Sequence, residues 1–159
     1  MNETADELGL KKSNYASAHG MYVEKNVSTA ADVARLCYHA MKNSRFREIV
    51  MYKEYEVPSR AFSPHMYHWE NTNFLLKREP NCTGIKTGIT WAAGPCLAAS
   101  MRKDDYHVCV VVLSCCSMDS RWYEVPKLVH WGVKKLQKIK QSTLKPKMKR
   151  QIIKSFTYI

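Results

Sequence analysis

A short polar motif near the middle of the chain, Lys86-Thr87-Gly88, has the residue types of an acyl-transfer site. On a short strand, such a triplet can line the cleft in which an acyl group is transferred. A cleft of this kind also needs a nucleophilic serine and, one helical turn later, a lysine that takes the proton from the attacking hydroxyl. Whether the chain contains that pair decides whether it can be an enzyme by itself.

The triplet lies on the first of three strands that the sequence predicts, over about 84–90, 95–102 and 107–115. Two turn signals, Ala93-Gly94-Pro95 and Lys103-Asp104-Asp105, separate these strands and favour an antiparallel meander. The third strand is apolar at nearly every position, so we expect both of its faces to be buried.

Helices are predicted before and after this meander. Ser28 can cap a helix over 29–43, whose apolar residues recur with helical spacing at Val33, Leu36, Cys37, Ala40 and Met41. A second helix is predicted over 120–139 from the stripe Leu128, Val129, Val133, Leu136 and Ile139. Shorter elements are predicted elsewhere: helices at 2–9 and 45–52, and irregular structure or a short hairpin at 53–69.

Composition and charge indicate a globular body with a basic tail. Apolar residues make up 45% of the 159 residues, and no apolar run is long enough for a spanning helix. The formal net charge of +11 is uneven, because residues 125–159 hold 10 Lys and Arg and no acid. We therefore divide the chain into a domain over 1–139 and a basic tail over 140–159. The tail could bind an anionic membrane weakly, or it could be a solvated, disordered tail. Since no nucleic-acid motif is present, a nucleic-acid partner is disfavoured.

The six cysteines form neither a C-x-x-C motif nor a zinc-like spacing with histidine. Cys37 and Cys109 lie within apolar patterns, which favours buried thiols, with a disulfide such as Cys82–Cys96 as the alternative. The first fifteen residues are acidic and polar and do not have the pattern of a signal peptide. The compartment and the redox state of the thiols therefore stay open.

Six segments of the chain, in order, resemble the serine-type D-alanyl-D-alanine carboxypeptidases, low-molecular-mass penicillin-binding proteins of the β-lactamase/transpeptidase-like superfamily: MN..A..LGL, AHGM, STAADVARL, NTNFLL, GIKTGIT..AG.CLAAS and VVVLS..S...R..E..KLVHWG. The resemblance runs from about Met1 to about Val133 and covers the C-terminal half of the family's catalytic domain. It implies an α+β fold, an antiparallel sheet flanked by helices. The fold would be incomplete, because the N-terminal strands and the nucleophile helix are absent.

The resemblance implies a substrate-binding role for five consecutive residues. Lys86 would place a cation beside the terminal carboxylate of the substrate, and the Thr87 hydroxyl would donate a hydrogen bond to it. Gly88 would let a peptide backbone approach the strand. The N–H of Ile89, where the family often has an aromatic residue or histidine, would form half of an oxyanion hole, and Thr90 repeats a family hydroxyl. The resemblance implies no cofactor and no metal.

The chain contains Ser-x-x-Lys twice, at Ser100–Lys103 and at Ser142–Lys145. The first falls at the end of a predicted strand after the triplet and the second in the basic tail, so neither has the family's context. Ser-x-Asn and Tyr-x-Asn do not occur. We interpret both matches as chance and predict that no catalytic residue lies on this chain, with the nucleophilic serine and its lysine expected upstream.

Other polar residues have simpler interpretations. His65 and His68 lie in a proline-rich segment without an evident third ligand, which disfavours a metal site. Asn71-Thr72-Asn73 is expected to bond loop backbone near the cleft. Arg121 and Glu124, one turn apart, are expected to pair on a helix surface.

The family reaction is release of the terminal D-alanine from a peptidoglycan stem peptide through an acyl-serine, and we predict that this chain alone cannot perform it. The strand over 107–115 would expose an apolar edge, which is a site for aggregation unless another chain covers it. Three interpretations stay open: a truncated gene product, assembly with a chain that carries the first half, or a non-catalytic homologue that serves as an interaction subunit. An enzyme half should gain penicillin acylation when the missing half is supplied, whereas an interaction subunit should co-purify with a partner and never acylate.

Overall fold

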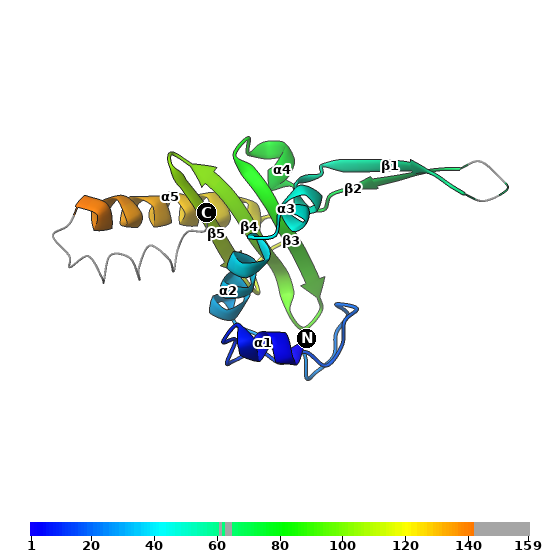
Figure 1. Cartoon of the computed structure of the whole chain (residues 1–159), viewed down its shortest axis with the longest axis horizontal. Helices are drawn as coiled ribbons and strands as arrows, with labels where there is room; N and C mark the ends of the chain where they lie inside the picture. The colour runs from blue at the N-terminus through cyan, green and yellow to red at the C-terminus, as the bar shows by residue number, and fades with distance from the viewer. Residues whose placement is uncertain (61, 63–64, 142–159) are drawn as a thin grey trace.

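The computed structural model describes residues 1–60, 62 and 65–141. Figure 1 shows the elements in order: α1 (Asn2–Glu7), α2 (Ala30–Ala40), α3 (Ser44–Met51), β1 (Glu54–Pro58), β2 (Met66–Glu70), α4 (Leu75–Arg78), β3 (Cys82–Thr90), β4 (Gly94–Lys103), β5 (Tyr106–Val112) and α5 (Ser120–Gln141). The basic tail predicted over 140–159 lies outside the described residues, except that α5 continues through Gln141. Among the helices of the described part, none combines the length and hydrophobicity that a membrane span needs.

The predicted antiparallel meander is confirmed. β3, β4 and β5 are neighbours in that order, with Ile85 opposite Ala99 and Ser100 opposite Cys109. The two turns use Gly94 at φ +65° and Asp104 at φ +53°, a backbone region that glycine and aspartate tolerate better than other residues. Together with the flanking helices, this sheet gives the mixed fold that the sequence predicts.

The long helix α5 covers one face of the sheet (Figure 1). Its buried apolar side chains pack against β4 and β5 and form the larger core cluster with Leu75, Leu76, Leu97 and Met101. The prediction that Leu128 belongs to this face is wrong, because the buried stripe passes through Val125 and Gly132 and leaves Leu128 39% exposed. Gly132 is buried in this stripe, and a Cβ added there would lie at an ordinary contact distance of 3.7 Å from Val108.

Two shorter helices cover the opposite face, where α2 contacts β5 and α3 contacts β3. The small core cluster there contains Cys37, Met41, Ile85 and Ala98. β5 is buried at Tyr106, Val108 and Val110 on the α5 side, but its alternate residues are only half-buried. The expectation that both faces of this strand are fully buried is therefore wrong, because two short helices cover less of the sheet than one long helix does.

The start of α2 differs from the prediction in its capping residue. Thr29, and not Ser28, accepts the capping bond, from the backbone N–H of Asp32 at 3.2 Å. Asp32 is buried and accepts bonds from the Lys12 N–H at 2.8 Å and the Ser13 hydroxyl at 2.9 Å. The first-turn acid thus fixes the loop before the helix, in addition to favouring the helix N-terminus.

Candidate functional site

β3 is an edge strand: among the described residues it pairs only with β4. Ile89 lies opposite Pro95, which has no N–H and so cannot exchange two backbone bonds with it. The pair is therefore of the non-hydrogen-bonded kind, in which the N–H and C=O of each residue point away from the partner strand. By the alternation of the ladder, the backbone groups of Thr87 and Ile89 point to the free edge of β3.

The side chains of the triplet lie beside this edge. Lys86 is exposed, and its ammonium donates to the carbonyl oxygen of Thr87 at 2.6 Å, which agrees with an outward-pointing carbonyl. The hydroxyls of Thr87 and Thr72 are 2.6 Å apart, and either oxygen can be the donor. If Thr72 donates, the Thr87 proton stays available for a ligand. Thr72 thus orients the candidate hydroxyl from fifteen residues away, a contact that the sequence analysis did not anticipate.

The rest of the predicted stretch divides into an open part and a turn. A Cβ added at Gly88 would meet nothing within 4 Å, so the strand is open there. Ile89 is 58% exposed and leaves its side chain in the solvent. The Thr90 hydroxyl accepts a bond from the Ala93 N–H at 3.1 Å and so stabilises the turn into β4. All five predicted residues are brought together on one strand, with Gly88 and Ile89 the most accessible to a peptide backbone.

A hollow of about 530 Å³ opens at the carboxyl end of β3. The loop from Tyr15 to Ser28 forms one wall, and Thr90, Ala92 and Ala93 form the other. The ring of Tyr22, which lines the hollow, lies 4.9 Å from the ring of Trp91, which follows Thr90 in the chain. This hollow could not be predicted from local sequence patterns, because its two walls are distant in sequence.

Ser100, the serine of the first Ser-x-x-Lys match, has no exposed surface. It lies within β4, where its hydroxyl is 2.8 Å from the Thr83 hydroxyl and 2.9 Å from Nε2 of His107. Burial, then the charges of Arg102 and Arg47, lowers the pKa of His107 to about 4. A buried strand serine without access to solvent cannot be the family's helical nucleophile, which agrees with the chance interpretation. The second match, Ser142–Lys145, lies outside the described residues.

All six cysteines are free thiols. The alternative disulfide between Cys82 and Cys96 is not formed, because these residues lie at opposite ends of the β3–β4 ladder, with Cys82 opposite Met101 and Cys96 opposite Gly88. Cys37 is buried as predicted, and burial raises the pKa of its thiol to about 11. The same prediction is wrong for Cys109, which is only half-buried.

The remaining polar predictions have mixed outcomes. Asn71 bonds loop backbone as expected, donating to the Tyr52 carbonyl at 2.9 Å. The predicted pair of Arg121 and Glu124 is wrong. Arg121 is buried and donates to the backbone carbonyls of Cys96 at 3.2 Å and Met118 at 3.0 Å, because α5 begins directly over the start of β4. In this way Arg121 ties the helix to the strand that holds β3 in place.

His68 contacts a carboxylate and not a second histidine. Its Nδ1 lies 2.9 Å from Glu56 across the hairpin. Within residues 1–60, 62 and 65–141, no group of three or more His, Cys, Asp or Glu side chains is placed to hold a metal ion.

Comparison with known proteins gives concordant results. The family model described as D-alanyl-D-alanine carboxypeptidase matches residues 1–116. The D-alanyl-D-alanine carboxypeptidase of Streptomyces sp. strain K15 is 32% identical over 135 residues, 83% of this chain and 46% of that protein. DacF, the D-alanyl-D-alanine carboxypeptidase of Bacillus subtilis, is 30% identical over 155 residues, 94% of this chain and 39% of that protein.

The solved structures agree. The Streptomyces K15 DD-transpeptidase superposes with a TM-score of 0.78 at 31% identity, over 84% of this chain and 52% of that chain. The D-alanyl-D-alanine carboxypeptidase of Mycobacterium tuberculosis, at 23% identity and a TM-score of 0.73, shares the fold. The chain spans about half or less of the length of these relatives.

Proposed function

Because the chain belongs to the D-alanyl-D-alanine carboxypeptidase family, we propose that the free edge of β3 binds the carboxyl end of a peptide that terminates in D-Ala-D-Ala, or a β-lactam in its place. The observation that carries the proposal is the alignment of this edge: the outward backbone groups of Thr87 and Ile89 lie beside the exposed ammonium of Lys86. An extended peptide can add to such an edge by backbone hydrogen bonds.

Each residue of the stretch has a separate task in this proposal. The ammonium of Lys86 leaves the Thr87 carbonyl and faces the terminal carboxylate of the peptide. The hydroxyl of Thr87 donates to the same carboxylate, with Thr72 as the donor that orients it. The missing side chain at Gly88 leaves room for the peptide backbone. The N–H of Ile89 donates to the carbonyl oxygen of the bond between the two D-alanines, where negative charge develops during acyl transfer.

Cleavage of that bond needs a serine hydroxyl that attacks the carbonyl carbon and releases the terminal D-alanine, followed by water that hydrolyses the acyl-serine. Among the described residues, the one serine in a Ser-x-x-Lys match, Ser100, is buried in the sheet. We therefore propose that these 159 residues bind the peptide without cleaving it, and that the nucleophile comes from other polypeptide.

A binding experiment with matched ligands tests the proposal. The isotope-labelled chain is titrated with a tripeptide that ends in D-Ala-D-Ala, and amide shifts are followed by NMR. We expect saturable shifts at Thr87 and Ile89, weaker binding of the same peptide with a carboxyl-terminal amide, and loss of binding in Lys86→Met. Lys103→Met, at the far end of β4, is the control that should bind normally. Equal binding of acid and amide would overturn the assignment of Lys86 and Thr87.

Treatment of the same chain with fluorescent penicillin separates binding from chemistry. No covalent label is expected on the 159-residue chain. A β-lactam ester on one of its own serines would contradict the proposal that the nucleophile lies elsewhere.

A second candidate, a non-catalytic interaction subunit, is favoured by the other edge of the sheet. β5 pairs only with β4 among the described residues, and its outer edge is formed by an apolar strand with half-buried residues such as Cys109 and Val111. A protein partner that adds a strand there would cover an aggregation-prone edge. If the chain co-purifies with such a partner and the pair does not react with penicillin, this candidate replaces the enzymatic one.

A further inference from the structure

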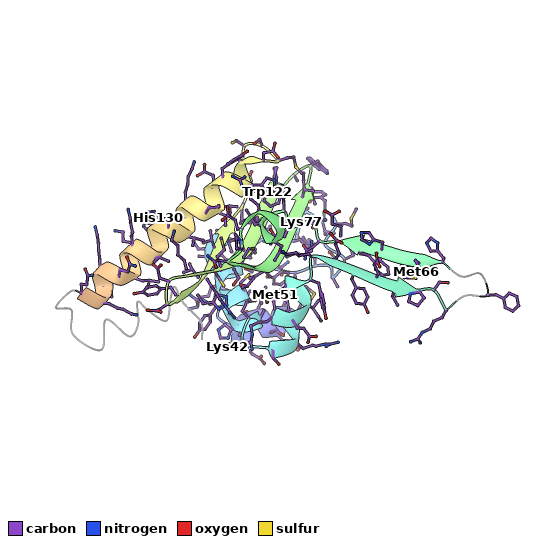
Figure 2. All side chains as sticks on the ribbon, turned by 90° about the horizontal axis from the view of Figure 1, so that it is seen from above. Lys42, Met51, Met66, Lys77, Trp122 and His130 are labelled. Atoms are coloured by element: carbon purple, nitrogen blue, oxygen red, sulfur yellow. The ribbon has the colours of Figure 1, made fainter. Side chains whose placement is uncertain are left out.

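The hairpin of β1 and β2 has two chemically different faces. In its antiparallel register, Tyr55 lies opposite Trp69 and Val57 opposite Tyr67, whereas the intervening pairs contain Glu54, Glu56, His68 and Glu70. Because successive side chains of a strand point to opposite faces, one face carries the rings and the other carries the charges. Figure 2 shows the hairpin, with Met66 on β2, extending away from the rest of the molecule. The aromatic face is defined here as Tyr55, Val57, Tyr67 and Trp69.

The charged face is satisfied by partners within the chain. The ammonium of Lys77, on α4, lies 3.1 Å from Glu54 and 2.8 Å from Glu70. His68 lies 2.9 Å from Glu56 on the same face. These contacts fix the hairpin against α4, and they direct its carboxylates away from the aromatic face.

The aromatic face is ordered and yet exposed. The rings of Tyr67 and Trp69 are 5.4 Å apart and 11° from parallel, and those of Tyr55 and Trp69 are 6.2 Å apart and 25° from parallel. Tyr55, Tyr67 and Trp69 are 53%, 45% and 51% exposed. A two-stranded hairpin is only marginally stable in water by itself, so exposed rings add little to its folding. A contiguous row of half-exposed aromatic rings is instead typical of a binding surface.

The base of the aromatic face is joined to the candidate site. The backbone N–H of Asn71 donates to the carbonyl of Lys53 at 2.8 Å, closing the hairpin. The next residue, Thr72, holds the hydroxyl of Thr87 on β3. A shallow hollow of about 160 Å³ at this base is lined by residues that include Tyr52, Tyr55 and Trp69. A ligand on the aromatic face would therefore lie on a platform fixed relative to the peptide-binding strand.

We propose that the aromatic face binds the glycan strand that carries the peptide, through stacking of sugar rings on Tyr55, Tyr67 and Trp69. The inference rests on the proposed function for the nature of the ligand. A pyranose ring presents a flat C–H face that matches a row of nearly parallel aromatic rings by dispersion and burial of apolar area. Lys53 and Glu54 both line the hollow at the base, so the platform has no excess of positive charge for phosphate groups.

A second copy of the chain fits this surface less well. About half of three rings remains exposed, which corresponds to roughly 300 Å² on each copy. Two such patches together fall well short of the ~1,200 Å² that stable protein interfaces bury. An anionic membrane is disfavoured because the hairpin carries three glutamates on its other face.

A peptide-free oligosaccharide tests the inference independently of the β3 site. The full 159-residue chain is titrated with a hexamer of β-1,4-linked N-acetylglucosamine, followed by NMR and tryptophan fluorescence. We expect saturable binding that 0.5 M salt leaves unchanged, and a loss of about tenfold in affinity in Trp69→Ala. Trp69→Phe should recover most of that affinity, which separates the loss of a ring from misfolding of the hairpin. Trp131→Ala, which removes an equally exposed tryptophan from α5, should bind as the unchanged chain does.

Several results would overturn the inference. They are the absence of hexamer binding, equal losses in Trp69→Ala and Trp131→Ala, and binding that Trp69→Ala leaves intact. Dimerisation or anionic-vesicle binding that depends on Trp69, without hexamer binding, would assign the face to a different partner. The hexamer has no peptide, so the two proposals can fail separately. If the chain binds the hexamer but not the tripeptide, only the function proposed for β3 is refuted. If it binds the tripeptide but not the hexamer, only the glycan platform is refuted.

Discussion

Replacement of Gly84 by alanine should destabilise the fold severely, because this glycine is where α3 contacts β3. Gly84 has φ +131°, and a Cβ there would lie 2.7 Å from Cγ2 and 3.1 Å from Cβ of Val50. The backbone conformation costs an L-residue about 1–3 kcal/mol, and the overlap with a branched side chain adds about 1–3 kcal/mol. We expect Gly84→Ala to lower the free energy of unfolding by about 2–6 kcal/mol, the sum of these two costs and a large part of a typical domain's stability.

Urea unfolding followed by tryptophan fluorescence measures this loss, and a second glycine of the same strand is the matched control. Gly88→Ala meets nothing within 4 Å and should change stability by less than about 0.5 kcal/mol, while hindering a peptide at the edge. Val50→Ala should partly rescue Gly84→Ala. The double variant should lose about 1–2 kcal/mol less unfolding free energy than the two single variants lose together. A loss below about 1 kcal/mol in Gly84→Ala, or no rescue, would refute the packing argument.

Three further predictions concern hydroxyl, imidazole and thiol groups. Thr72→Val should weaken tripeptide binding about 3–10-fold without lowering the unfolding midpoint, because the Thr87 hydroxyl loses its orienting partner; NMR titration and urea unfolding measure the two effects. The free energy of unfolding should fall by about 1–2 kcal/mol as pH falls from 7 to 4, because His107 is protonated near pH 6.5 in the unfolded chain and only near 4 in the folded chain. Partial exposure of the imidazole ring reduces the effect. Melting temperatures should show this pH dependence in the unchanged chain and not in His107→Gln. At pH 8 a thiol reagent should modify exposed Cys116 quickly and buried Cys37 only after unfolding, and rapid labelling of Cys37 in the folded chain would contradict its burial.

The elements were predictable where a local pattern matched the packing, and errors arose where a contact came from a distant segment. Apolar spacing located α2 and α5, and turn residues located the meander. Leu128 has the same spacing as its neighbours, but the side of α5 that faces the sheet carries Val125 and Val129 and leaves Leu128 partly exposed. Arg121 and Glu124 have the spacing of an ion pair, but the carbonyl of Cys96, reached only through the fold, competes for the guanidinium.

The candidate site shows the same division. The stretch from Lys86 to Thr90 was identified through the family resemblance, because its consecutive residues match one motif of that family, whereas Thr72 joins it only through the position of the hairpin. The hairpin itself was one of two predicted alternatives for 53–69. Apolar residues at every second position, Tyr55 and Val57 in one segment and Tyr67 and Trp69 in the next, indicated two strands. Proline at 58 and 64 weakened this indication.

The two edges of the sheet make different demands on what covers them. β3 offers polar groups and an open glycine at its edge, and Lys86 discourages permanent pairing with another strand, as charged residues on edge strands do. Such an edge suits a ligand that binds and leaves. β5 offers an apolar strand, and Cys109 and Val111 are only half-buried on the face that α2 covers. An edge of that kind suits a permanent cover, which is the demand that the proposed interaction-subunit candidate would meet at β5.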